Sequence, residues 1–221
     1  MKISIFGLGY VGLVTSAFFL KNGHNVYGID ISKKKISNLN KGTSVIKEPG
    51  VNKILSDFQK KNRFIPSSNI IDGLSKTNIS IICVGTPSKS SGSINLSSIN
   101  SVLKEIGIYL KNKKKFHVLI IRSTVLPNTC KFKFIPLLEK YSRKKNGEHF
   151  NLFFNPEFLR EGSALKDFKN PSVIVYGSDS SKGKNIVNNI SKNIKGKTFF
   201  TDFQTAETIK YMNNVWHAYK I

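Results

Sequence analysis

Three glycines near the N-terminus form a pattern that can bind a phosphate group. Gly7, Gly9 and Gly12 spell G-x-G-x-x-G within "SIFGLGYVGLV", after a short apolar run. After a strand, the first glycine permits a tight turn, the second admits a pyrophosphate and the third lets helix and strand pack closely. The N–H groups of Tyr10 and Val11 would then face the phosphate charge. The pattern predicts a dinucleotide site, and a glycine turn without a ligand is the alternative.

An acidic residue follows where such a site binds a ribose. Asp30 comes directly after the second apolar run, "NVYGI", at a distance from the glycines where a carboxylate accepts hydrogen bonds from a ribose diol. A carboxylate there repels a 2′-phosphate, so the sequence predicts NAD rather than NADP. The basic stretch 32–35, "SKKK", weakens this contrast.

Hydroxyl groups follow two further apolar runs. Thr86 lies in "ICVGTP" (82–87), and Thr124 lies in "IRSTVLPNT" (121–129). Ligands of open α/β sheets bind beyond the C-terminal ends of the strands, so both hydroxyls are predicted to lie near the cofactor. The alternative is that each threonine only caps a turn.

Two glutamates lie in "FFNPEFLREGSALKDF" (153–168). Glu157 and Glu161 are four residues apart, so on a helical turn they would share a face. Paired carboxylates suit water activation or proton transfer, whereas an ordinary solvated face is the alternative. Because Asn155 and Pro156 precede the pair in a chain with only 13 acidic residues, a dedicated loop is indicated.

The last stretch, "TAETIKYMNNVWHAYKI" (205–221), has the spacing of an amphipathic helix. Lys210, Asn214 and His217 follow i, i+4, i+7 and form one polar stripe. Its flank is apolar: Ile209, Met212, Trp216 and Tyr219. The stripe is suited to binding a polar substrate or stabilising an oxyanion, with simple solvent exposure as the alternative.

Alternating elements must position these residues. Apolar runs predict strands at 2–6, 25–29, 79–84, 117–122, 151–154, 172–176 and 197–200. Helices are predicted between them at 11–21, 33–40, 51–61, 96–110, 129–141 and 182–193. This order predicts an α/β fold with a Rossmann-like, doubly wound and mostly parallel sheet. We expect an NAD-binding domain over residues 1–200, and the start of a long central helix over 201–221.

The charge balance raises the question of a polyanion partner. The 221 residues include 35 basic and 13 acidic ones, a formal net charge of +22. Nucleic-acid readers rely on arginine forks, but only four of the basic residues are arginines: Arg63, Arg122, Arg143 and Arg160. Because the lysines are spread along the whole chain, they indicate a solvated surface and no nucleic-acid partner.

Cysteine usage and hydropathy limit the compartment. Cys83 and Cys130 lie far apart and suggest neither a disulfide framework nor a metal site, so a reducing, cytoplasmic location is expected. The stretch 3–20 carries no charge and is long enough for a signal peptide or a membrane span. Its glycines interrupt it early and its start fits a strand, so no membrane segment is predicted.

Five stretches in order resemble the UDP-glucose/GDP-mannose dehydrogenase family: "FGLGYVG", "VGTPS", "RSTVLPNT", "NPEFLREGSA" and "AETIKYMNNVWHAYK". The resemblance implies the four-electron oxidation of a nucleotide sugar's primary alcohol to a carboxylate, with two NAD used in turn. "RSTVLP" and "NNVWHA" are more similar to the branch that oxidises GDP-mannose than to the branch that oxidises UDP-glucose.

The resemblance also assigns roles. It implies that NAD contacts Tyr10, Val11, Asp30, Lys35, Thr86 and Thr124. It implies that the sugar nucleotide contacts Glu161, Lys210, Asn214 and His217. Lys210 and Asn214 would stabilise developing oxyanion charge, Thr124 would help to place a water, and Glu157 would lie near that hydrolytic water.

The chain departs from the family in one respect. The family's nucleophilic cysteine lies in a G-G-S-C motif of the C-terminal half, which this chain lacks, and neither Cys83 nor Cys130 matches its position. The last helix resembles the family's central helix, which joins the halves and supports homodimer contacts. We therefore expect an N-terminal part that is inactive in full turnover alone. A non-catalytic NAD-binding module and a polyanion-binding protein are the alternatives.

Overall fold

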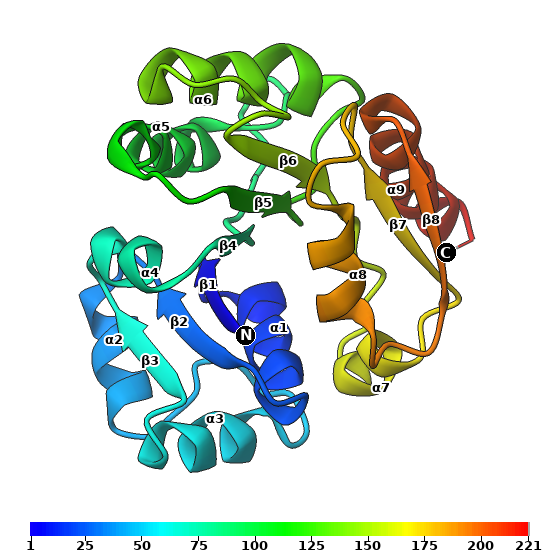
Figure 1. The fold of residues 1–221 in the computed structure, drawn as a ribbon. Helices are drawn as coiled ribbons and strands as arrows, with labels where there is room; N and C mark the ends of the chain where they lie inside the picture. Colours follow the sequence, from blue (N-terminus) through cyan, green and yellow to red (C-terminus); the bar gives the residue numbers. More distant parts are fainter. Residues whose placement is uncertain (221) are drawn as a thin grey trace.

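The computed structural model describes residues 1–220 and contains one sheet of eight strands. The strands lie in the order β3-β2-β1-β4-β5-β6-β7-β8, as Figure 1 shows. Neighbours from β3 to β6 are parallel, β7 runs antiparallel to β6, and β8 is parallel to β7. Their bounds are Lys2–Phe6 (β1), Asn25–Ile29 (β2), Phe64–Ser67 (β3), Ile79–Ile82 (β4), His117–Ile121 (β5), Phe150–Phe154 (β6), Val173–Gly177 (β7) and Lys197–Thr201 (β8).

Helices cover both faces of this sheet. One hydrophobic core contains side chains of α1 (Tyr10–Lys21), α2 (Lys33–Asn40), α3 (Val51–Lys60), α7 (Ala164–Lys169) and α8 (Lys184–Ser191). The other contains side chains of α4 (Ile70–Lys76), α5 (Ser97–Asn112), the π-helix η1 (Cys130–Phe134), α6 (Ile135–Ser142) and α9 (Phe203–Tyr219). Strands β4, β5 and β6 are buried along their whole length, which explains why their sequences are mostly apolar. The predicted doubly wound α/β fold is confirmed.

Three short elements were not predicted, and one helix differs from its prediction. Strand β3 contains Pro66 and lies at the end of the strand order, where a strand tolerates a residue without an N–H. Helices α4 and α7 are only seven and six residues long, too short for a clear helical period. The helix predicted at 129–141 begins as η1, and its wider turn leaves no signature in a 3.6-residue pattern.

A chain of polar side chains crosses the middle of the sheet. His117 Nε2 lies 2.8 Å from Ser80 Oγ, which lies 2.7 Å from Ser4 Oγ. Ser4 in turn lies 3.0 Å from Thr77 Oγ1, whose hydroxyl donates to the Gly73 carbonyl. These contacts join β1, β4 and β5, the strands whose ends position the two sites below.

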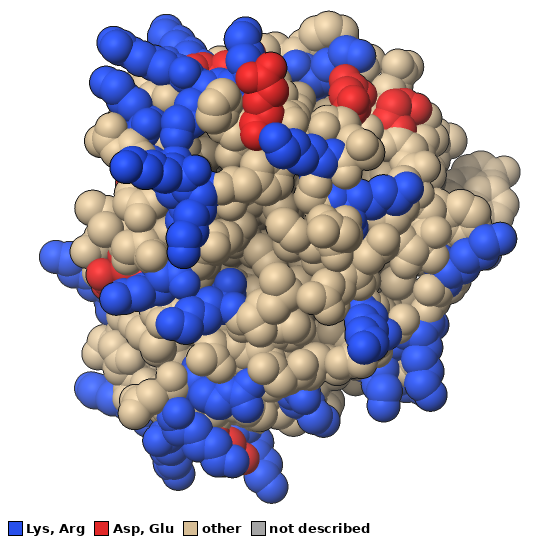
Figure 2. Space-filling model, viewed as in Figure 1, with Lys and Arg blue, Asp and Glu red and all other residues tan. Residues whose placement is uncertain are grey.

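The surface is strongly basic, but the basic side chains are not gathered in one patch on the face shown in Figure 2. Figure 2 shows Lys and Arg side chains spread around the visible face, with few acidic side chains between them. Helix α9 lies beside β7 (Figure 1) and exposes Met212, Trp216 and Tyr219 along its second half. No helix within residues 1–220 is both long enough and apolar enough to cross a membrane.

Candidate functional site

The three glycines form the tight turn between β1 and α1. Gly7 has φ +89°, and a Cβ there would lie 2.8 Å from Val84 Cα. At Gly12 a Cβ would lie 1.9 Å from the Gly7 carbonyl oxygen, so both positions exclude a side chain. At Gly9 no atom of the described chain lies within 4 Å of an added Cβ. This open space beside the first turn of α1 is where the backbone can approach a pyrophosphate.

The Asp30 carboxylate, directly after β2, is fixed against this turn. It accepts the Leu8 amide at 2.8 Å, the Ser32 amide at 2.9 Å and the Lys35 ammonium at 2.6 Å. Burial disfavours the charged carboxylate, but the hydrogen bonds from Lys35, Ser32 and Leu8 outweigh burial, so the pKa of Asp30 is lowered. Asp30 is therefore an ionised acceptor with a fixed orientation.

A cavity of about 430 Å³ joins these features. Its wall is built by the glycine turn, by Asp30 and Lys35, by Cys83–Gly85 after β4, and by the first turns of α5. Ligand pockets typically have volumes of roughly 300–1,000 Å³. Open space at Gly9, free amides at the start of α1 and a carboxylate for a ribose diol fit a dinucleotide.

The two predicted hydroxyl residues lie together. Thr86 donates its hydroxyl to the Thr124 carbonyl at 2.8 Å, and the neighbouring Ser123 donates to the Val84 carbonyl at 2.6 Å. These bonds tie the loop after β4 to the loop after β5. The Thr86 hydroxyl therefore bonds across two loops instead of capping its own turn, and the contacts of both threonines with NAD stay predictions.

Glu157 and Lys210 form a nearly buried ion pair across 53 residues of sequence. The Lys210 ammonium lies 2.9 Å from Glu157 Oε1 and donates to the Glu157 carbonyl at 2.6 Å. The second carboxylate oxygen accepts the Leu159 amide at 2.8 Å. The structure therefore brings together a residue of the loop after β6 and one of α9, which the sequence predicted as catalytic.

The predicted helical turn with Glu157 and Glu161 on one face is wrong. Residues 155–160 have no regular secondary structure, and a turn begins at Glu161, which is exposed. The carboxylate of Glu157 accepts the Leu159 amide within the loop and the Lys210 ammonium from α9, so its position depends in part on a distant helix. The segment is a loop, as Asn155 and Pro156 indicated, and its dedicated catalytic role stays a prediction.

Glu48 anchors this loop and was missed by the sequence analysis. It is buried, and its carboxylate accepts the Tyr10 hydroxyl at 2.6 Å, the Gly162 amide at 2.8 Å and the Ala164 amide at 2.9 Å. Burial opposes ionisation, yet these hydrogen bonds lower the pKa of Glu48, while burial and Glu48 raise the pKa of Tyr10. One carboxylate thus joins the start of α1 to the loop after β6. In the sequence, the turn-like stretch "EPG" (48–50) ahead of α3 was the only pattern that pointed to Glu48.

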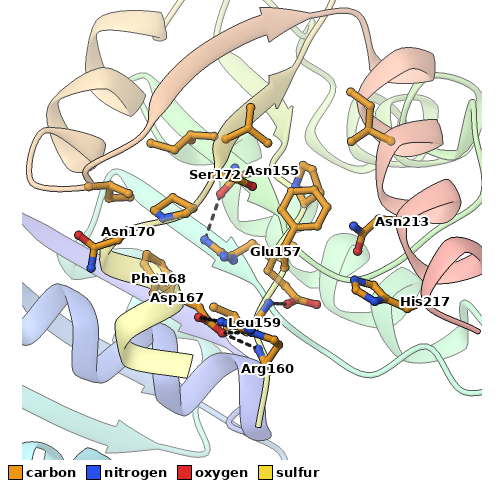
Figure 3. A pocket seen from close by; sticks show the side chains of 18 residues that line it. Asn155, Glu157, Leu159, Arg160, Asp167, Phe168, Asn170, Ser172, Asn213 and His217 are labelled. Carbon is orange, nitrogen blue, oxygen red and sulfur yellow. Dashed lines mark hydrogen bonds and ion pairs between the residues drawn. The ribbon is translucent and has the colours of Figure 1, made fainter. Parts of the chain in front are cut away.

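A second cavity, of about 490 Å³, lies between this loop and α9. Figure 3 shows Asn213 and His217 on α9 across this cavity from Asn155 and Glu157. The residues of α9 that line the cavity are therefore Ile209, Asn213 and His217. Asn214 is exposed and is absent from the cavity lining within residues 1–220. The roles of Asn214, His217 and Glu161 stay predictions.

The two thiols are buried and protonated. Burial raises the pKa of Cys83 to about 12, and burial together with the nearby Glu207 carboxylate raises that of Cys130 well above its ordinary value. Glu207 itself accepts the Cys130 amide at 2.8 Å. Because the thiolate is the nucleophile, neither cysteine is poised for covalent chemistry.

Comparisons with known proteins agree with this geometry. The UDP-glucose/GDP-mannose dehydrogenase family, NAD binding domain, matches residues 1–195. Over 221 residues the chain is 41% identical to GDP-mannose 6-dehydrogenase of Pseudomonas putida, covering 100% of the chain and 50% of the relative. It is 37% identical to UDP-glucose 6-dehydrogenase of Rickettsia bellii over 224 residues, again 100% and 50%.

Solved structures give the same result. GDP-mannose dehydrogenase from Pseudomonas aeruginosa, solved as a ternary complex, superposes with a TM-score of 0.97 at 40% identity, covering 100% of this chain and 50% of that one. UDP-glucose dehydrogenase from Pyrobaculum islandicum gives 0.91 at 30% identity, covering 97% and 49%. The chain spans about half the length of the relatives that it matches.

Proposed function

The chain belongs to the UDP-glucose/GDP-mannose dehydrogenase family, and from this membership we propose that it is the NAD-binding part of a nucleotide-sugar 6-dehydrogenase. One observation carries the proposal: Glu48 links the glycine turn of the cofactor cavity to the loop that holds the Glu157–Lys210 pair. A dinucleotide cradle and an acid–ammonium pair thus lie at neighbouring loops of one sheet.

Each group has a defined task in the proposed site. NAD, when bound, supplies the hydride acceptor. The open space at Gly9 admits its pyrophosphate, the amides of Tyr10 and Val11 donate hydrogen bonds to the phosphate oxygens, and Asp30 accepts hydrogen bonds from a ribose diol. On the sugar side, the Lys210 ammonium donates to an oxygen that gains negative charge. Glu157, beside that ammonium, is placed to accept a proton from water.

The proposed substrate is GDP-mannose rather than UDP-glucose. Identity to the GDP-mannose 6-dehydrogenase of Pseudomonas putida is 41%, against 37% and 32% to UDP-glucose 6-dehydrogenases of Rickettsia bellii and Haloferax volcanii. We assign residues 1–200 to the cofactor domain and 201–221 to the start of the inter-domain helix. The exposed apolar residues of α9 support a homodimer of the whole enzyme, and two free buried cysteines support a cytoplasmic location.

Calorimetric titration tests the substrate assignment. The chain is saturated with NAD and titrated with GDP-mannose and with UDP-glucose, alongside His217→Ala. We expect GDP-mannose to bind more tightly and the variant to bind it at least about tenfold more weakly, a loss of about 1.4 kcal/mol. Tighter binding of UDP-glucose contradicts the assignment. Binding of NAD without either sugar nucleotide leaves only an NAD-binding module.

A further inference from the structure

Arg122 is a buried cation that has no counter-ion among residues 1–220. It follows β5 directly, is 7% exposed and lines the cavity beside α9. Its Nη1 donates to Asn155 Oδ1 at 3.0 Å, and its guanidinium lies 4.6 Å from the centre of the Phe168 ring. Its Nε has no hydrogen-bond partner within residues 1–220, and no carboxylate of those residues lies within 4.0 Å of the guanidinium.

The other charges of this region are paired. Arg160 forms an ion pair with Asp167 at 2.8 Å, and the Arg160 guanidinium lowers the pKa of Asp167 to about 2. Lys210 is paired with Glu157. Within the described part of the chain, the positive charge of Arg122 is therefore left uncompensated in the wall of the cavity. Burial of an ionised group without a partner opposes folding, and an anion bound in the cavity would compensate this charge.

The residues around Arg122 fix the orientation of its guanidinium and leave most of its N–H donors unused. The Asn155 amide nitrogen donates to the Val175 carbonyl at 2.8 Å, which fixes the amide with its oxygen toward Arg122. A guanidinium carries five N–H donors in a planar fork, and Asn155 takes one of them. The donors that remain match the two oxygens of a carboxylate or a phosphate.

We propose that Arg122 is an anion-binding residue at the floor of this cavity, and that it takes the carboxylate or phosphate group of a bound ligand. Asn213, His217 and Ser172 line the same cavity and supply polar contacts for the rest of the ligand (Figure 3). The inference rests on the proposed function in that it uses the same cavity. The carboxylate would there be that of an oxidised sugar, and the phosphate that of a nucleotide.

Thermal unfolding with three small probes tests the site. Glucuronate supplies a sugar carboxylate, inorganic phosphate supplies a phosphate, and methyl glucoside is the neutral control, all at one ionic strength. We expect one anion to raise the Tm of the wild-type chain in a saturable way. Arg122→Met should weaken the binding of that anion at least tenfold. Without any probe, the variant should be as stable as the wild type or more stable, since a buried unpaired charge is removed.

Two further variants separate a ligand site from a structural role. Arg143→Met removes the same charge from the exposed surface and should keep the anion response. Asn155→Asp places a carboxylate beside Arg122 and gives up the hydrogen bond to the Val175 carbonyl. The new ion pair should offset that loss, so the variant should stay folded, even where Arg122→Met does not fold, and should lose anion binding. A response to glucuronate alone or to phosphate alone identifies the anion.

The opposite results overturn the inference. They are the absence of any saturable anion response in the wild type, an undiminished response in Arg122→Met or Asn155→Asp, or an equal loss in Arg143→Met. NAD binding by the wild-type chain is measured in parallel. Its failure with the anion response intact counts against the proposed function alone, and the reverse result counts against the anion site alone.

Discussion

The cofactor cavity and the cavity beside α9 hold their charges in opposite ways. In the first, the Asp30 carboxylate already accepts three donors from the chain, and Gly9 leaves open space for a ligand. In the second, Arg122 is buried with no counter-ion among residues 1–220, and His217 is exposed. The cofactor cavity is therefore preformed, whereas the proposed anion site of the second cavity gains its counter-charge only from a ligand.

The Glu157–Lys210 pair gives the largest expected effect, because both charges are nearly buried. Lys210→Met leaves the Glu157 carboxylate without its ammonium, which we expect to lower the free energy of unfolding by about 3 kcal/mol. Chemical denaturation measures this loss. The double variant Lys210→Met/Glu157→Gln should recover much of it, and a double variant as unstable as the sum of the two single ones would show that the pair is not coupled.

A matched pair of glycine variants tests whether the cofactor cavity is preformed. Gly12→Ala places a Cβ 1.9 Å from the Gly7 carbonyl oxygen, so the turn must shift, at a cost of about 3 kcal/mol in unfolding free energy. Gly9→Ala meets open space and should change stability by less than about 0.5 kcal/mol. Equal losses in the two variants would contradict this account of the turn.

Glu48 connects the two cavities, and Glu48→Gln should loosen that connection. The amide keeps the size of the carboxylate but brings N–H groups against the Gly162 or Ala164 amide, which leaves a donor unpaired at a cost of about 2 kcal/mol. Hydrogen exchange at these two amides should become faster. Unchanged exchange would mean that the loop after β6 is held by other contacts.

Acid should destabilise the chain through His117. Burial, aided by the charge of Lys113, lowers the pKa of His117 from 6.5 to about 3. Between these values the unfolded chain binds a proton that the folded chain does not, so stability falls as the pH falls from 6.5 toward 3, by at most about 1.4 kcal/mol per pH unit. The free energy of unfolding is measured at pH 7 and pH 5 for the wild type, for His117→Gln and for the exposed control His149→Gln. The difference between the two pH values should be smaller than in the wild type for His117→Gln only.

Local rules explain which parts of the molecule were predictable. The glycine turn, Asp30 and the strand–helix order depend on neighbouring residues, and the structure has them as predicted. Strand β3 was missed because Pro66 argues against a strand, although an end position in the sheet tolerates it.

The second cavity was less predictable because distant segments build it. Glu157 owes its position to Lys210 on α9, so spacing within its own segment gave a helical turn that does not exist. Arg122 stood out only as one of four arginines, since its burial depends on Asn155 and Phe168. Asn213 faces the cavity in place of Asn214 because the orientation of α9 is set by its packing on β7 and β6.

Calorimetric titration with NAD tests the central claim, a preformed NAD site in this chain, most directly. Wild type, Gly9→Ala and Asp30→Ala are titrated under one condition. We predict one site in the wild type and at least about tenfold weaker binding in both variants, equivalent to about 1.4 kcal/mol, with the fold of Gly9→Ala unchanged by circular dichroism. No binding by the folded wild-type chain, or equal affinity in all three proteins, would contradict the claim.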